Sequence, residues 1–359
     1  MELKLAPEIL NAFGFSATET TITQIGSGLI NRTYLLSPQF EGKKYILQNI
    51  NTSVFKKPQT IADNLRAIAD YLSKTNPDYL FVKPILTTNG EEMAFIDEEY
   101  WRLLPFVSDT VALDVLTDPQ QAYEAAKQFG KLSRLLNHFQ SSLLQATIPE
   151  FHNLGLRFDQ FTLAMKATSA YLKEQATQEI ETGLAHKYLL DNFITYTHRS
   201  DFPDRVMHHD TKISNVLLDA NTFKGVCVID LDTIMPGKFI SDLGDMMRTY
   251  LCACSENETD LRKVSIRLPY FEALIQGYLS EMKDILTQTE KELILFSGQY
   301  IIYMQALRFL TDFLNHNIYY QVSYPAQNLD RAKNQFKLLS ELIAKEKELQ
   351  NIVEKCLLS

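Results

Sequence analysis

The feature of this sequence that most constrains its fold is a change of pattern close to residue 107. Residues 21–50 alternate β-prone residues with glycine and proline turn signals, which predicts three short antiparallel strands. An amphipathic helix and a further pair of strands follow. From about Pro119 onward, apolar residues recur mainly at helical spacing. The sequence therefore predicts an α+β protein with two lobes, a small antiparallel β-sheet lobe over residues 1–106 and a larger, mainly helical lobe over residues 107–359.

The elements of both lobes carry local signals. The helix of the first lobe is expected between Pro58 and Pro77, and the strand pair after it is expected to turn at Asn89 and Gly90. In the second lobe one β segment interrupts the helices, where NVLLD and GVCVIDLD flank a turn. The buried face of the first-lobe helix is expected to consist of Ile61, Leu65, Ile68 and Leu72.

The composition excludes several classes of protein. The chain has 359 residues, of which 45% are hydrophobic and 22% charged, as in ordinary globular proteins. A net charge of −9 argues against a general nucleic-acid surface. The most apolar window, Leu293–Leu310, is interrupted by polar residues and is interpreted as a buried helix. Because the four cysteines lack zinc-site spacing and the first residues lack a signal-peptide pattern, we expect a cytoplasmic protein without a nucleic-acid or membrane partner.

The strongest local motif is HHDTKISNVLLD at residues 208–219. It fits a kinase catalytic loop, in which an Asp accepts the proton of the acceptor hydroxyl and an Asn five residues later binds a metal ion. In this chain the two residues are Asp210 and Asn215. The alternative is that Asp210 caps a turn and Asn215 begins a strand, as these residue types often do.

A second acidic motif, VIDLDT, makes the kinase interpretation stronger. Asp230 ends a strand after a short hairpin, where a kinase places its metal-binding Asp, and a carboxylate suits a hard divalent ion. Asp232 faces the same way on a strand of period two, and is either a second metal ligand or a substrate contact. Asp242 and Asp245 are interpreted as residues that stabilise the start of a helix.

Near the N-terminus a glycine-rich turn could let backbone amides approach phosphates closely. It consists of Gly26, Ser27 and Gly28. It is not a P-loop, because no Lys-Ser/Thr pair follows at the required spacing, and Asn31 stands where a dinucleotide fingerprint has its third glycine.

Taken in order, the segments GSGLIN, YILQNIN, WRLLPF, HHDTKISN, VIDLDTIMPG, SDLGD and QALRFLTDFLN resemble the aminoglycoside phosphotransferase and choline kinase superfamily. Within it, the sequence is most similar to the N-acetylhexosamine 1-kinases, from about Ile22 to Tyr320. The resemblance implies a two-lobed protein-kinase-like fold with ATP between the lobes.

The same resemblance implies roles for individual residues. Asp210 would be the catalytic base, and Asn215 and Asp230 would bind Mg²⁺. Arg308 would contact the sugar, although an ion pair with Asp312 on the helix surface is the alternative. The hinge that bonds adenine would run from Leu104 to Phe106.

One position departs from the wider kinase pattern. The strand YILQNI carries Gln48 where a phosphate-pairing Lys is expected, while Lys43 and Lys44 lie earlier on it. A Gln can orient phosphate oxygens but supplies no charge, so compensation must come from magnesium or another cation.

These observations predict transfer of the γ-phosphoryl group of ATP to the anomeric hydroxyl of an N-acetylhexosamine. A neutral sugar needs mixed donors and acceptors, and we expect these to include Arg308, Asn31, Asp232 and Tyr319. The alternatives are another sugar, an amino alcohol or an aminoglycoside as acceptor, or a nucleotide-binding pseudokinase that acts as an interaction module. Five other histidines are interpreted as ordinary surface or core residues: His138, His152, His186, His198 and His316. The oligomeric state is left open.

Overall fold

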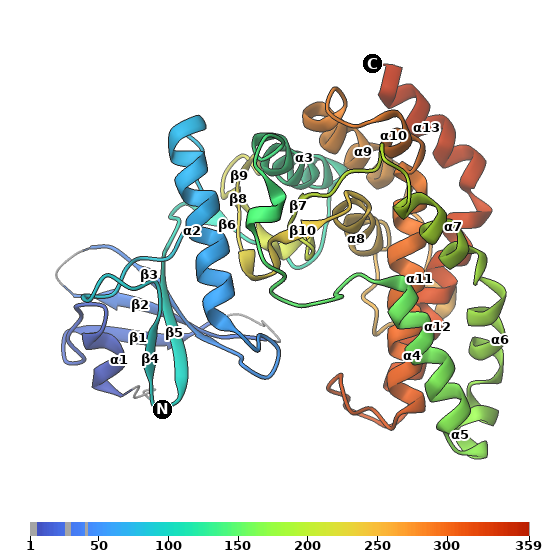
Figure 1. The fold of residues 1–359 in the computed structure, drawn as a ribbon, viewed down its shortest axis with the longest axis horizontal. Coiled ribbons are helices and arrows are strands. Elements are labelled where there is room, and N and C mark those ends of the chain that lie inside the picture. The colour runs from blue at the N-terminus through green and yellow to red at the C-terminus, as the bar shows by residue number, and fades with distance from the viewer. Residues whose placement is uncertain (1–5, 26–29, 40–41, 359) are drawn as a thin grey trace.

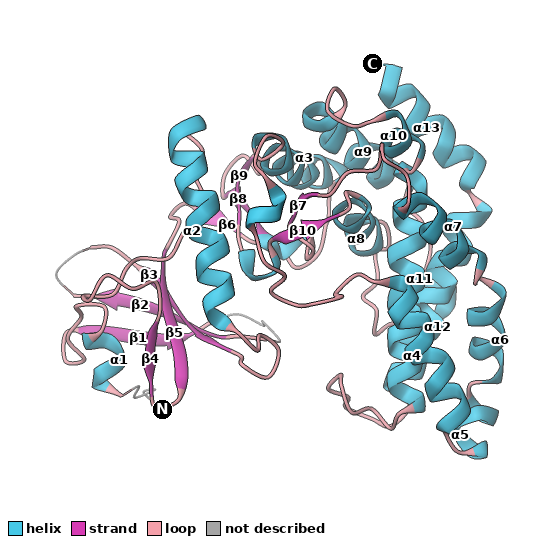
Figure 2. Cartoon of the chain, viewed as in Figure 1, coloured by secondary structure: helices cyan, strands magenta, loops and turns pink. Residues whose placement is uncertain are grey.

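The computed structural model describes residues 6–25, 30–39 and 42–358. The described chain forms a β-sheet lobe and a larger helical lobe, with helix α2 between them (Figure 1). Figure 2 shows the strands gathered in the first lobe and in the centre of the molecule, with helices filling the far side. The α+β architecture predicted from the sequence is therefore confirmed.

The first lobe holds a five-stranded antiparallel sheet of order β1-β2-β3-β5-β4. Its buried face forms a small core around Leu36, Leu47, Trp101 and Leu103. The elements of this lobe are α1 (Pro7–Asn11), β1 (Thr20–Gln24), β2 (Arg32–Pro38), β3 (Tyr45–Ile50), α2 (Pro58–Thr75), β4 (Ala94–Ile96) and β5 (Glu99–Pro105).

The predicted turn at Asn89 and Gly90 is present: Gly90 has a φ of 84°, and Thr87 donates its N–H to the carbonyl oxygen of Glu91 at 2.8 Å. This turn precedes β4, however, and the hairpin between β4 and β5 reverses at Asp97 and Glu98, which both have positive φ. Two successive left-handed residues match the right-handed twist of a hairpin, but they are usually Asn or Gly. The pair Asp-Glu gives no such signal, so the sequence pattern missed this turn.

The second lobe has two small sheets, ordered β6-β8-β9 and β10-β7, surrounded by helices. Its strands are β6 (Thr110–Val111), β7 (Arg205–Met207), β8 (Val216–Asp219), β9 (Gly225–Val228) and β10 (Met235–Gly237). Its α-helices are α3 (Pro119–Leu135), α4 (Leu154–Ala167), α5 (Ala170–Gln175), α6 (Thr177–Ala185), α7 (Tyr188–Thr197), α8 (Ile240–Tyr250), α9 (Leu268–Met282), α10 (Gln288–Glu292), α11 (Ile294–Leu314), α12 (Gln327–Ala344) and α13 (Glu346–Leu358). The segment predicted as a buried helix rather than a membrane span lies mostly in α11. None of the described helices combines the length and the apolar character that crossing a bilayer requires.

Helix α2 connects the two lobes. Its predicted face, Ile61, Leu65, Ile68 and Leu72, is buried and packs into the main core of the helical lobe rather than into the small core of the sheet. Asn64 on the same helix is also buried and donates to the carbonyl oxygens of Gln145 and Ile234, at 2.8 and 3.0 Å. A buried amide that finds such partners avoids the cost of an unsatisfied polar group. The helix therefore fixes the sheet against the central strands.

Helices α3 and α9 pack closely enough to exclude a side chain at one position. A Cβ atom added to Gly277 would lie 2.2 Å from the backbone oxygen of Tyr123. Because the obstacle is backbone, it cannot rotate away, and the helices would have to separate.

We expect Gly277→Ala to lower the free energy of unfolding by about 1–3 kcal/mol, the usual cost of overpacking a core. The matched control is Gln276→Ala on the exposed side of the same helix, which should change stability by less than about 0.5 kcal/mol. Urea denaturation monitored by circular dichroism measures both. Equal midpoints for Gly277→Ala and the wild type would contradict the close packing of α3 and α9.

Candidate active site

The candidate catalytic loop, residues 208–215, joins β7 to β8 in the centre of the molecule (Figure 1). Two aspartates of helix α8 hold this loop through its backbone N–H groups. The carboxylate of Asp242 accepts the backbone N–H groups of His208 at 2.9 Å and His209 at 2.7 Å. Asp245 accepts the N–H of Thr211 at 2.8 Å. His209 has a positive φ of 65°, so these bonds keep the loop in a conformation that a non-glycine residue seldom adopts.

The interpretation of Asp242 and Asp245 as residues that stabilise the start of a helix is confirmed only in part, because Asp242 lies in the first turn of α8 but neither side chain caps the helix. The residue before α8 is Phe239, which makes no side-chain cap, and both carboxylates bind the catalytic loop instead. Both are buried, and burial raises the pKa of Asp242 to about 6, while His208 and the two backbone donors favour its charged form. Sequence spacing places these residues on one helix but does not show what lies across from them.

His208 is a structural residue of the loop. Its Nδ1 accepts the N–H of Asp210 at 3.2 Å, so its Nε2 carries the proton and donates to the carbonyl oxygen of Ile229 at 3.0 Å. The side chain is buried against the ring of Phe129. It thus ties the catalytic loop to the end of β9.

Asp210 lies at the centre of a small polar cluster. Its Oδ2 accepts from Lys212 Nζ at 3.0 Å and from Asn215 Nδ2 at 3.0 Å. Burial disfavours the charged carboxyl, but the charge of Lys212 and the hydrogen bonds from Lys212 and Asn215 hold its pKa below the ordinary value. Asp210 is therefore ionised at neutral pH. Lys212 was not singled out from the sequence, although it stands inside the motif two residues after Asp210.

Asp230 faces the same cluster from the segment after β9, immediately before a 3₁₀ turn over Leu231–Thr233. It has a left-handed backbone, with φ 58°, and the preceding Ile229 donates its N–H to the carbonyl oxygen of Asn215 at 2.9 Å. Desolvation by the surrounding protein and the like charges of Asp232 and Asp210 raise the pKa of Asp230 above its ordinary value, against the opposing charges of Lys212 and Arg102, although the residue keeps contact with solvent. A carboxylate in such surroundings would be stabilised by a cation.

The available donors fit a magnesium ion rather than a metal held wholly by protein. Within the described ranges, no group of three or more His, Cys, Asp or Glu side chains could hold a metal ion. Because Asn215 uses its amide nitrogen on Asp210, its oxygen is the atom that can coordinate a metal beside Asp230. Magnesium usually takes one or two such protein ligands and completes its shell with water and phosphate oxygens.

Asp232 and Asn31 lie together, at the junction of the lobes. Asn31 Nδ2 donates to Asp232 Oδ2 at 2.7 Å, and Asn31 Oδ1 accepts the N–H of Asn51. The other oxygen of Asp232 forms a buried ion pair with Arg102 of β5. Gln48 in turn accepts two bonds from the same guanidinium. Asn31 and Asp232, which are both expected to contact the acceptor, thus bind each other, and each also binds a residue of the sheet lobe.

A second group, formed by Arg308, Phe151, His152, Tyr319 and Tyr320, lies next to the catalytic loop. The guanidinium of Arg308 lies between 5.6 and 5.8 Å from the ring centres of Phe151, Tyr319 and Tyr320. His152 stacks on Phe151, and its Nδ1 lies 3.3 Å from Nδ1 of His209. The structure therefore brings Arg308 and Tyr319 together, as expected, and adds His152, which had been interpreted as an ordinary residue.

The alternative interpretation of Arg308 does not hold. Asp312 makes no ion pair with Arg308; its carboxylate accepts the N–H groups of Tyr319 and Tyr320 at 2.8 and 2.9 Å. Among the described residues, the one hydrogen-bond acceptor of Arg308 is Gln305, at 3.2 Å. Asp312 therefore shapes the loop after α11, and Arg308 stays available for a ligand.

The proposed nucleotide contacts are only partly described. Gly26, Ser27 and Gly28 lie outside the described residues. Leu104 pairs with Ile46 at the end of β5, and Phe106 donates its N–H to the carbonyl oxygen of Lys44 at 3.3 Å. The segment from Leu104 to Phe106 thus continues the pairing of β5 with β3.

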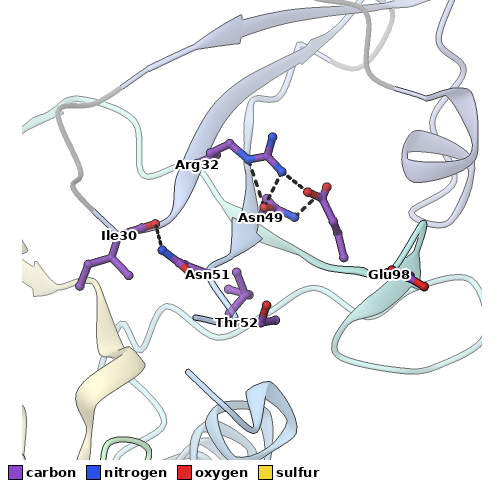
Figure 3. A pocket seen from close by; sticks show the side chains of 8 residues that line it. Ile30, Arg32, Asn49, Asn51, Thr52 and Glu98 are labelled. Carbon is purple, nitrogen blue, oxygen red and sulfur yellow. Dashed lines mark hydrogen bonds and ion pairs between the residues drawn. The ribbon is translucent and has the colours of Figure 1, made fainter. Parts of the chain in front are cut away.

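A cavity of about 300 Å³ opens beside β2, β3 and the β4–β5 turn, and it is lined by polar residues (Figure 3). Arg32 bonds Asn49 and Glu99 there, and Asn51 donates to the carbonyl oxygen of Ile30. Successive residues of a strand point to opposite faces, so Arg32 and Asn49 lie on the face away from Thr33, Gln48 and Arg102. This cavity is therefore separate from the cluster around Asp210.

Comparison with known proteins identifies the family. A sequence model described as the phosphotransferase enzyme family matches residues 21–272, most of the chain, so this protein belongs to the phosphotransferase enzyme family. This confirms the resemblance to the aminoglycoside phosphotransferase and choline kinase superfamily.

Solved structures confirm the protein-kinase-like fold. A microcompartment-associated aminopropanol kinase is 15% identical with a TM-score of 0.65, over 95% of this chain and 97% of that one. An aminoglycoside phosphotransferase from Alicyclobacillus acidocaldarius is 13% identical with a TM-score of 0.62, over 98% of each chain. An ethanolamine kinase from Plasmodium vivax is 14% identical with a TM-score of 0.55, over 92% and 85%. All three of these similar structures are named as kinases or phosphotransferases of small molecules.

We expect Asp242→Asn to lower both stability and activity. An Asn presents an N–H₂ group to one of the two backbone donors, so the free energy of unfolding should fall by about 1–3 kcal/mol. Phosphotransferase turnover should fall by about 10-fold or more, because the catalytic loop loses its anchor. Chemical denaturation and steady-state kinetics measure the two effects. The control Asp191→Asn removes an exposed carboxylate and should change neither; an active, stable Asp242→Asn protein would show that the anchor is dispensable.

Proposed function

We propose that this phosphotransferase is an ATP- and Mg²⁺-dependent small-molecule kinase whose acceptor is the anomeric hydroxyl of an N-acetylhexosamine, giving the sugar 1-phosphate. One observation carries the kinase assignment. The carboxylate of Asp210 is hydrogen-bonded to Lys212 and Asn215 and lies close enough to Asp230 for the two carboxylates to interact electrostatically. This is the set of groups that phosphoryl transfer from a nucleotide needs.

Asp210 would orient the acceptor hydroxyl and accept its proton. Its lowered pKa keeps the carboxylate ionised at neutral pH, and its two hydrogen bonds fix its direction. Such a base contributes mainly by holding the hydroxyl in line with the phosphoryl group, and the proton moves late in the reaction. Lys212 lies close enough to Asp210 to bring a positive charge to the transferred group.

Asn215 and Asp230 would hold the metal, Asn215 through its amide oxygen and Asp230 through its carboxylate. When bound, Mg²⁺ neutralises charge on the phosphates. The remaining work of these residues is structural, since the backbone bond from Ile229 to Asn215 keeps the two ligands side by side.

The charge around Arg308 supports a neutral acceptor. Burial lowers the pKa of Arg157, and the positive charge of Arg308 lowers it further; burial and His209 lower the pKa of His152, and Arg308 adds to that shift. An amino alcohol or an aminoglycoside brings its own positive charge, which this wall would repel. Aromatic rings beside a hydrogen-bond donor suit a sugar with polar substituents and an apolar ring face.

The first experiment is ADP release by the purified protein with Mg²⁺ and ATP, against N-acetylglucosamine, N-acetylgalactosamine, unacetylated hexoses, choline, ethanolamine and an aminoglycoside. We expect turnover with the N-acetylhexosamines only, and loss of at least about 1,000-fold in Asp210→Asn, which should still bind ATP. Turnover with another acceptor would replace the substrate but keep the mechanism. No turnover with any acceptor, despite nucleotide binding, would favour a pseudokinase.

Replacement of Arg308 tests whether this side chain binds the acceptor. In Arg308→Leu we expect the KM for the N-acetylhexosamine to rise by about 10- to 100-fold, the effect of losing a hydrogen bond from a charged donor, with the KM for ATP unchanged. The control is Arg199→Leu, an arginine of the surface, which should alter neither constant. A change in the KM for ATP alone would place Arg308 at the nucleotide instead.

A further inference from the structure

Strand β3 carries Gln48 where a kinase lysine is expected, and the neighbouring strand β5 carries a cation, Arg102. Strands β3 and β5 are antiparallel, and their register places Arg102 directly opposite Gln48. Gln48 is itself opposite Thr33 of β2. Side chains of paired residues share a face of the sheet, so these three residues lie on one face and the cavity residues Arg32 and Asn49 on the other.

Arg102 is a buried charge in an apolar strand. Its side chain is only 2% exposed, and it lies on the face of β5 opposite the small core that holds Trp101 and Leu103. An isolated guanidinium in such a place would be costly, so its partners must explain it. Nε and Nη2 donate to Gln48 Oε1 at 3.0 and 2.7 Å, and Nη1 pairs with Asp232.

The guanidinium is not fully used by these contacts. Nη1 and Nη2 each carry a second N–H. For the part of the chain that the structure describes, these second N–H groups have no acceptor. Arg102 therefore has donors left over for a ligand.

The position of these donors is at the junction between the lobes. Asp232 lies two residues after Asp230, the candidate metal ligand, and is also held by Asn31 of the first lobe. The guanidinium is thus tied at one end to the sheet through Gln48 and at the other to the segment that carries Asp230.

Resting on the kinase function proposed above, we propose that Arg102 is the phosphate-binding cation of this enzyme, in the role that a lysine on the third strand fills in protein kinases. Gln48 holds the guanidinium in plane through two N–H groups, and the remaining donors bind phosphate oxygens of the nucleotide. A guanidinium suits this task because its fork matches a phosphate, and it never loses its charge. The same arrangement explains why position 48 holds a Gln, since a lysine there would place a second positive charge beside Arg102.

A purely structural role is the competing explanation. Arg102 could serve only to neutralise Asp232 and join the lobes, since breaking a buried pair on one side leaves the other charge uncompensated. The single variant Arg102→Gln does not separate the two explanations, because it leaves Asp232 unpaired and could lose nucleotide binding by unfolding. The pair must therefore be neutralised together.

The test compares Asp232→Asn with the double variant Arg102→Gln/Asp232→Asn. The two proteins differ only at Arg102, and the double variant leaves no unpaired carboxylate at position 232. Isothermal titration measures the Kd of each for Mg·ATP and for adenosine, which has the base and ribose but no phosphate, and thermal denaturation checks that both fold. Nucleotide binding needs no acceptor, so the outcome does not depend on which sugar is the substrate.

We expect the double variant to bind Mg·ATP about 10- to 100-fold more weakly than Asp232→Asn, the equivalent of one lost charge-assisted hydrogen bond. Adenosine should bind both proteins within about twofold. Adding Gln48→Lys to the double variant moves the charge to the third strand and should restore most of the Mg·ATP affinity.

Equal Mg·ATP affinity in the two folded proteins would overturn the proposal and leave Arg102 as a bridge between the lobes. If the double variant does not fold, Arg102→Lys decides: the lysine keeps a charge beside Asp232 but loses the fork that matches a phosphate, so Mg·ATP affinity should fall while adenosine affinity stays within about twofold, and unchanged Mg·ATP affinity in a folded Arg102→Lys protein overturns the proposal. A wild-type protein that binds no Mg·ATP would instead refute the kinase function itself, and this inference with it.

Discussion

The active site depends on the grip of helix α8 on the catalytic loop. Asp242 accepts two consecutive backbone N–H groups, and Asp245 accepts a third, so the loop has little freedom although His209 adopts a left-handed backbone. A carboxylate that is itself buried holds these donors strongly, because water does not compete for them. Hydrogen bonds from the loop to the carboxylates of helix α8 thereby offset the free-energy cost of the strained loop conformation. Asp210, Lys212 and Asn215 can then form one connected cluster.

The junction of the lobes is held by a second polar network. The carboxylate of Asp232 pairs with Arg102 and accepts a hydrogen bond from Asn31, both of the sheet lobe. Asn64 of α2 donates to the carbonyl oxygen of Ile234, two residues after Asp232. These contacts fix the sheet relative to Asp230, which is the geometry that a nucleotide bridging the two lobes requires. A kinase needs this precision because most of its catalysis is positioning and charge stabilisation rather than covalent chemistry. The buried charges cost desolvation, and the network of partners offsets that cost.

The acceptor side has the opposite electrostatic character to the metal side. Asp210, Asp230 and Asp232 concentrate negative charge where a metal ion would bind, whereas Arg308 and Arg157 bring positive charge to a wall of aromatic rings. The fold is shared with kinases and phosphotransferases named for amino alcohols and aminoglycosides, so the fold does not select the acceptor. Under the proposed function, the few side chains around Arg308 select the acceptor.

The sequence by itself determined the two-lobed α+β architecture, the amphipathic helix α2 and the motifs containing Asp210, Asn215 and Asp230, because periodicity and short-range spacing are local properties. It missed the Asp97–Glu98 turn, whose residues carry no turn signal, and it did not show what Asp242 and Asp245 bind, because their partners lie more than thirty residues away. Only the tertiary structure showed that Asp232 pairs with Arg102, that Arg102 lies opposite Gln48, and that His152 joins His209. A buried polar side chain is defined by what faces it, and strand register and helix packing decide that.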